Sequence, residues 1–66
     1  MSKETIRDAN GRIIGYIVTE SNGNAYSEKF VGGRVGTYNK YTDEVYKFAG
    51  GYVGKGKGLL ASLLFN

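Results

Sequence analysis

The chain has 66 residues, with nine Lys and Arg against six Asp and Glu, 11 Gly, and neither His nor Cys. A domain this short buries only about 60% of the surface that its unfolded chain exposes, so we expect marginal stability unless a partner supports it. Without Cys there is no disulfide, and without Cys or His there is no zinc site of the usual kind. A Ser or Thr nucleophile also lacks the imidazole that would take its proton. The composition therefore predicts a non-enzymatic protein with no cofactor and no metal.

Charge is distributed unevenly along the chain. Residues 1–28 hold three basic and four acidic residues, whereas residues 29–66 hold six basic and two acidic ones. The start, Met-Ser-Lys-Glu-Thr, lacks the apolar core of a signal peptide, and the apolar cluster at residues 59–65 is too short to cross a bilayer. We expect a cytoplasmic protein with no membrane partner.

An eight-residue segment occurs twice. Residues 29–36 read KFVGGRVG and residues 47–54 read KFAGGYVG, with six of the eight positions identical. A more diverged copy, RDANGRIIG at residues 7–15, has Asn-Gly in place of Gly-Gly and one extra residue before its last Gly. Repetition at a short period indicates that one supersecondary unit is used several times.

Each unit has the pattern of a β-hairpin. Asn-Gly and Gly-Gly are the dipeptides of a two-residue type I′ turn, in which both central residues take positive φ. Runs of β-branched and aromatic residues flank these dipeptides, as is typical of strands. The prediction is an all-β fold in a single domain, residues 1–66: an antiparallel meander of about six short strands, with hairpin units at about 5–20, 26–39 and 44–55.

A third glycine recurs after each turn, at Gly15, Gly36 and Gly54. These glycines fall inside the predicted strands, where glycine usually marks a bulge, a bend or the close approach of another backbone. Three such bends would curl the meander into a half-barrel.

The strand after the first turn has apolar residues on both faces. Ile14, Tyr16 and Val18 alternate with Ile13 and Ile17. This pattern predicts a strand that is covered on both sides.

The tail, residues 58–66, is predicted to form a short apolar helix or strand, because its leucines follow a helical stripe although the segment is short. It either covers the open face of its own sheet or crosses to a second chain. Each large apolar side chain, once buried, contributes about 1.5–3 kcal/mol. We therefore expect a homodimer or higher oligomer that associates through Leu59, Leu60, Leu63, Leu64 and Phe65.

One segment matches a phosphate-binding motif in part. Residues 51–58 fit G-x-x-x-x-G-K, but Gly58 stands where the motif needs Ser or Thr for magnesium. The hairpin repeat already accounts for two of its glycines. A structural role is therefore favoured over nucleotide binding.

Six Tyr and three Phe are interleaved with basic residues, which suits two kinds of partner. Tyr and Arg dominate protein-protein hot spots, so binding to another protein is the first hypothesis; its candidate residues are Tyr38, Lys40, Tyr41, Tyr52, Lys55 and Lys57. Aromatic and basic residues also bind single-stranded nucleic acid, which is the alternative; its candidates are Lys40, Lys47, Lys55 and Lys57 with neighbouring tyrosines.

Residues 6–16, IRDANGRIIGY, resemble the opening of a group of short, mostly uncharacterised proteins from phage, prophage and bacterial genomes. Those proteins repeat an R-D-x-x-G-R-I-x-G-Y element and end in a leucine-rich tail. The resemblance implies a mobile-element accessory protein, such as an inhibitor that occupies the surface of a host defence protein. A bacterial host cytoplasm would then be its location.

Overall fold

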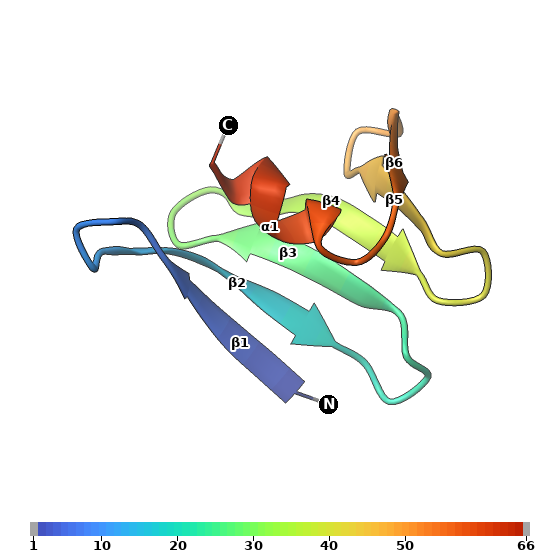
Figure 1. Cartoon of the computed structure of the whole chain (residues 1–66), viewed down its shortest axis with the longest axis horizontal. Helices are drawn as coiled ribbons and strands as arrows, with labels where there is room; N and C mark the ends of the chain where they lie inside the picture. Colours follow the sequence, from blue (N-terminus) through green and yellow to red (C-terminus); the bar gives the residue numbers. More distant parts are fainter. Residues whose placement is uncertain (1, 66) are drawn as a thin grey trace.

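The computed structural model describes residues 2–65. Six strands form one antiparallel sheet in which each strand pairs with its neighbours in sequence, and a short helix follows the last strand (Figure 1). The predicted six-stranded meander is thus confirmed, and the apolar tail forms a helix. The elements are β1 (Ser2–Arg7), β2 (Ile13–Thr19), β3 (Ala25–Lys29), β4 (Gly33–Asn39), β5 (Glu44–Lys47), β6 (Tyr52–Lys55) and α1 (Leu59–Leu64).

Helix α1 lies against one face of the sheet and contacts β2 to β6 (Figure 1). Leu60 is fully buried and Leu64 is 5% exposed, and both pack with Ile17, Ala25 and Val45 of the sheet. Of the two positions expected for the tail, this conformation shows the one over the sheet of its own chain. Within residues 2–65, no helix is long and apolar enough to span a membrane.

Each of the three repeat hairpins, β1–β2, β3–β4 and β5–β6, carries a β-bulge beside its strand glycine. The register shifts by one residue where β1 meets β2, where β3 meets β4 and where β5 meets β6. The unpaired residues are Ile14, Val35 and Val53, each directly before the recurring glycine. Of the roles expected for the strand glycines, a bulge, a bend or a close approach, the structure shows a bulge directly before each one.

The hairpin turns differ from the expected two-residue type. The Gly11 N–H donates to the Asp8 carbonyl at 3.0 Å and the Asp8 N–H donates to the Arg12 carbonyl at 2.9 Å, which closes a three-residue loop. Gly11 has φ of 83°, and Asp43 is the only non-glycine residue with positive φ in the described chain, so Asn10 lacks the positive φ that a type I′ turn requires. A three-residue loop with glycine in its last position also suits the twist of a hairpin.

The other two repeat hairpins have loops of the same length. Lys29 pairs with Gly33 across one loop, and the Lys47 N–H donates to the Gly51 carbonyl across the other. Positive φ falls at the third loop residue, which is Gly32 or Gly50, and in the second hairpin it also occurs at the next residue, Gly33. When these two glycines are aligned with Gly11, the loop glycine precedes the strand glycine by four residues in every unit. The extra residue of the first copy disappears in this alignment.

Strand β2 is buried on both faces, as its sequence predicts. Ile17 is 7% exposed on the helix side and Val18 is 6% exposed on the opposite side. The assignment of Ile14 to the face of Tyr16 was wrong. Because the bulge interrupts the alternation, Ile14 packs against the core cluster instead.

The three strand glycines face three leucines of α1. A Cβ added to Gly15 would lie 2.8 Å from Leu64 Cδ2, and one added to Gly54 would lie 2.8 Å from Leu59 Cδ1. Real Cβ atoms do not approach other carbons this closely. The repeat therefore provides space for the helix at three places, and no element within residues 2–65 covers the other face of the sheet.

Candidate binding surface

A row of directly paired side chains crosses all six strands on the face opposite α1. Paired residues lie on the same side of a sheet, so successive pairs define this row. We name it the tyrosine row; its members, from β1 to β6, are Lys3, Val18, Tyr26, Thr37, Tyr46 and Tyr52.

A second row of paired residues lies beside the tyrosine row, and a cation of one row covers a tyrosine ring of the other row at two places. In the second row Tyr16 pairs with Glu28, and Glu28 pairs with Arg34. The Lys3 Nζ lies 4.1 Å from the centroid of the Tyr16 ring, and the Arg34 Cζ lies 3.8 Å from the centroid of the Tyr26 ring. Such cation–π contacts hold long side chains in place and orient the rings.

The far end of the tyrosine row is a pair of rings. Tyr46 and Tyr52 meet edge to face with centroids 5.4 Å apart. The Tyr46 hydroxyl donates to Glu44 Oε1 at 3.2 Å. This hydrogen bond to a carboxylate raises the pKa of Tyr46 above its ordinary value, with partial burial as the second cause. The phenol therefore stays neutral and keeps its donor role over a wide pH range.

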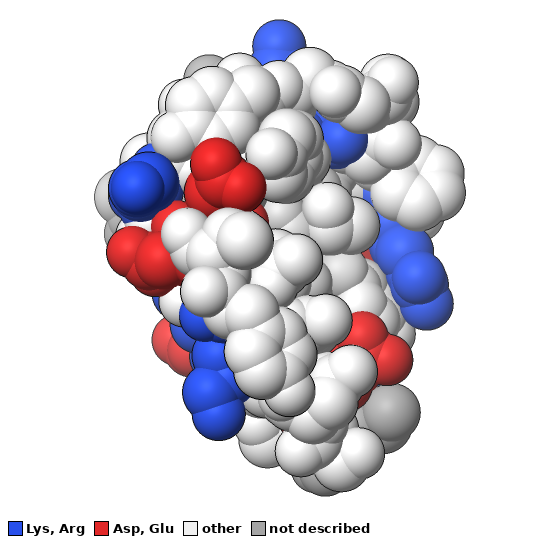
Figure 2. Space-filling view, turned by 90° about the vertical axis from the view of Figure 1, so that its right-hand side faces the viewer, with Lys and Arg blue, Asp and Glu red and all other residues white. Residues whose placement is uncertain are grey.

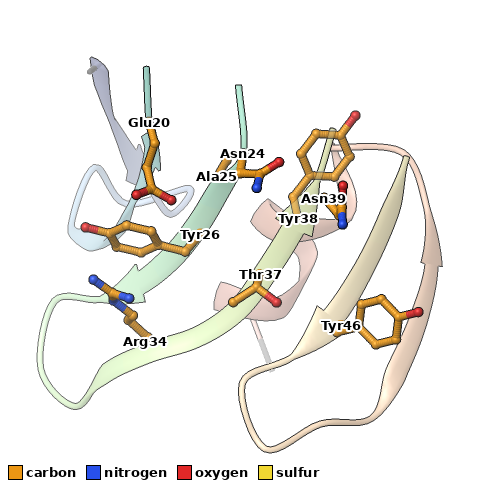
Figure 3. Close-up of a pocket in the computed structure, with 9 residues that line it drawn as sticks. All are labelled: Glu20, Asn24, Ala25, Tyr26, Arg34, Thr37, Tyr38, Asn39 and Tyr46. Carbon is orange, nitrogen blue, oxygen red and sulfur yellow. The ribbon is translucent and has the colours of Figure 1, made fainter. Parts of the chain in front are cut away.

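A groove lies between two members of the row. Figure 3 shows Tyr26 and Tyr46 on either side of Thr37, which forms the floor. The groove has a volume of about 330 Å³, and Glu20 and Arg34 lie near Tyr26 at its margin (Figure 3). Hydroxyl, carboxylate and guanidinium groups thus surround an aromatic cleft, which suits a ligand with both apolar and hydrogen-bonding groups.

Both signs of charge occur around the tyrosine row. Glu44 pairs with Lys55 at the β6 end, and Glu28 pairs with Arg34 near the middle. Figure 2 shows the side of the molecule that lies to the right in Figure 1, and there too acidic and basic side chains are interspersed. A mixed surface of this kind suits a protein partner better than a polyanion.

Two of the sequence-predicted partner residues reach this face. Tyr52 is a member of the tyrosine row and is 56% exposed, and Lys55 lies on the same strand beside Glu44. Tyr38 lies on the helix side, packs against the core, and donates its hydroxyl to Asp43 Oδ1 at 2.8 Å.

The other predicted partner residues lie away from the row. Lys40 and Tyr41 are in the loop between β4 and β5, where Tyr41 is 81% exposed. The Lys57 Nζ donates to Thr19 Oγ1 at 2.7 Å, so it ties the segment before α1 to β2. The predicted set is therefore divided among four places.

The tail residues predicted for self-association are mostly enclosed by their own chain. Leu60 and Leu64 are buried, and Leu59 and Leu63 are partly buried against the core. Phe65, at 60% exposure, is the tail side chain that remains open to a second molecule. Homodimerisation stays a prediction, and in this conformation its surface cannot be built from the two buried leucines.

Sequence reasoning missed Tyr16, Tyr26, Tyr46 and Arg34 as members of one surface. The signal was the period-two alternation in Tyr16-x-Val18, Tyr26-x-Glu28 and Glu44-x-Tyr46. Alternation within a strand does not give the register between strands, and three bulges shift that register.

Similarity to known proteins does not assign a function to this surface. No protein-family model matches the chain, and neither a curated protein nor a solved structure shows significant similarity to it.

Proposed function

We propose that this chain is a small non-enzymatic binding protein that holds a protein partner against the tyrosine row. The observation that supports this most strongly is the continuous row itself, with Tyr26, Tyr46 and Tyr52 on a face that no element covers. Tyrosine buries a large area at low entropic cost and keeps one polar group for a hydrogen bond. The lack of His and Cys supports a role without catalysis.

The sheet supplies a rigid platform for this row. The residues on its opposite face pack on α1, so the backbone beneath the tyrosines is held by the core. Lys3 and Arg34 hold two tyrosine rings by cation–π contacts, and Tyr46 and Tyr52 hold each other by ring contact. Preordered side chains lose little freedom on binding, which favours affinity.

The resemblance of residues 6–16 to phage and prophage proteins suggests the kind of partner. On that basis we propose a bacterial host protein, such as a component of a defence system, whose surface is blocked by the tyrosine row. The molecule would then act by steric occupation alone.

The test is affinity capture followed by a binding measurement with single variants. A protein captured by the wild-type chain from a bacterial lysate would be purified and titrated against Tyr46→Ala, Tyr52→Ala and Tyr41→Ala. Tyr41 is the matched control, because it is the same residue type, is 81% exposed and lies in a loop away from the row. We expect about tenfold or greater loss for the row variants and unchanged affinity for the control. Equal affinities for all chains would refute the assignment.

Binding of single-stranded nucleic acid is the second candidate. It is favoured by the stacking rings and by the cations over Tyr16 and Tyr26. Glu28 and Glu44 on the same face oppose it. Retention on single-stranded DNA that weakens steeply with salt, and that is lost in Tyr26→Ala, would support this candidate; no retention at low salt would exclude it.

A further inference from the structure

A second binding feature lies at the end of the sheet that carries the repeat loops. The two closest copies of the repeat each begin with Lys-Phe, at residues 29–30 and 47–48. The Phe30 N–H donates to the carbonyl of the bulged Ile14 at 3.0 Å, and the Phe48 N–H donates to the carbonyl of the bulged Val35 at 3.1 Å. The two phenylalanines therefore occupy equivalent positions, each one docked on the bulge of the preceding hairpin.

Both rings are open to solvent although they are large and apolar. Phe30 is 59% exposed and Phe48 is 61% exposed, and Val31 beside Phe30 is 81% exposed. Large apolar side chains that are exposed at one end of a small domain indicate an interaction site. The equivalent loop of the first hairpin has Ala9 and Asn10 instead, so this feature is limited to the second and third units.

A hollow of about 510 Å³ lies beside these loops. Its apolar lining consists of Val35 of β4, Phe48 and Ala49 of the β5–β6 loop, and Leu63 of α1. The charged residues that line it are Lys29, Arg34 and Lys47, and among residues 2–65 no Asp or Glu lines it. It is thus an apolar depression with basic residues around it, unlike the mixed surface of the tyrosine row.

We propose that this hollow binds an acidic, apolar segment of a partner protein. One large apolar side chain of that segment would cover Leu63 and Phe48, while its carboxylates would lie beside Lys47 and the other basic residues. The charge complementarity favours an acidic partner, and the apolar floor favours a peptide over a bare polyanion. The site goes beyond the tyrosine row. Arg34 lines both surfaces, with its guanidinium over the Tyr26 ring, so the test uses Lys47 and Phe48, which line the hollow and not the groove of the tyrosine row.

The test uses fluorescence polarisation with two short labelled peptides. Both contain Leu and Phe; one has these flanked by Asp and Glu, and the other has Lys at the same positions. The proteins are the wild type, Lys47→Glu, Phe48→Ser and Lys40→Glu. Lys40→Glu is the matched control, because it changes the net charge equally on an exposed loop residue that does not line the hollow and lies away from the tyrosine row.

We expect the wild type to bind the acidic peptide and not the basic one. Lys47→Glu should weaken binding by about tenfold or more, while Lys40→Glu should leave it unchanged. Because Lys47 and Phe48 are both exposed, neither substitution removes a core contact, and thermal melting of each variant checks this. If Phe48→Ser melts early, Lys47→Glu alone decides the question.

Several results would overturn the proposal. Equal weakening by Lys47→Glu and Lys40→Glu would show general charge attraction without a site. Failure of the acidic peptide to bind, or equal binding of the basic peptide, would exclude the hollow as an acidic-segment site. Binding to vesicles of phosphatidylserine and phosphatidylcholine, without binding to the acidic peptide, would assign the exposed phenylalanines to a lipid surface instead.

Discussion

Leu63 of helix α1 occupies the space above Gly36 where any other residue would place its Cβ. A Cβ at Gly36 would contact Leu63 Cδ1 directly, and it would also lie 3.2 Å from Ser27 Oγ and 3.3 Å from the Tyr46 carbonyl oxygen. Gly15 and Gly54 stand in the same relation to Leu64 and Leu59. The strand glycines of the repeat therefore make room for the leucines of the tail, although the two features look unrelated in the sequence.

Gly36→Ala should lower the free energy of unfolding by about 1–3 kcal/mol, because the added methyl group forces Leu63 and the backbone of β5 to move. Urea denaturation measures this change. Gly51→Ala is the control, since its Cβ would meet nothing closer than Lys47 Cδ at 3.6 Å. Similar losses for the two variants would argue against a specific fit between Gly36 and the helix.

The three-residue loop of the first hairpin and a type I′ turn predict different stability losses for substitutions in the turn. Gly11 has φ of 83° and its Cβ position is empty, so Gly11→Ala should cost about 1–2 kcal/mol through backbone strain alone. Asn10→Ala should be nearly neutral, because Asn10 does not have positive φ. A type I′ turn would make both substitutions costly, and thermal melting of the two variants distinguishes these cases.

Ser27 is fully buried beneath the helix, and within residues 2–65 its Oγ has no hydrogen-bond partner. A buried hydroxyl without a partner costs free energy, so Ser27→Ala should raise the free energy of unfolding by about 1 kcal/mol. Equilibrium denaturation of the two chains gives the answer. A clear loss of stability would mean that the hydroxyl has a partner in solution.

Tyr38 makes stability depend on pH in the alkaline range. Its hydrogen bond to the Asp43 carboxylate raises the pKa of Tyr38 above 10.0, and desolvation and the charge of Asp43 act in the same direction. A raised pKa in the folded state favours the protonated form, so its stabilising contribution is full below pH 10.0 and is lost as the pH rises through the folded-state pKa. Tyr38→Phe should therefore lose less stability than the wild type above that pH.

Asp43→Asn tests the origin of this effect. Asp43 has φ of 58°, a conformation that Asn also adopts readily, so the loop should keep its shape. Without the carboxylate, the alkaline titration of Tyr38, followed by its ultraviolet absorbance, should move to lower pH. An unchanged titration would show that Asp43 does not cause the shift.

The sequence predicts the strands well because its turn and strand signals are local. Gly-Gly and Asn-Gly mark the hairpins, and the interior glycines mark the bulges. The sequence does not predict the position of the tail. A stripe of leucines shows which face of the helix must be buried, but it does not show whether the sheet of its own chain or that of a second chain covers this face. The tyrosine row was missed because its register depends on the bulges, which place Lys3 opposite Val18 and Tyr26 opposite Thr37.

The most direct test of this account asks which molecule covers the leucines of α1. An equimolar mixture of ¹³C-labelled and unlabelled chains, examined by isotope-filtered nuclear Overhauser spectroscopy, separates contacts within a chain from contacts between chains. We expect a cross-peak between the Leu63 methyl groups and the Gly36 Hα protons within the labelled chain, and none between labelled and unlabelled chains. A cross-peak between chains for this pair would contradict it, because the helix would then cover the sheet of a second copy.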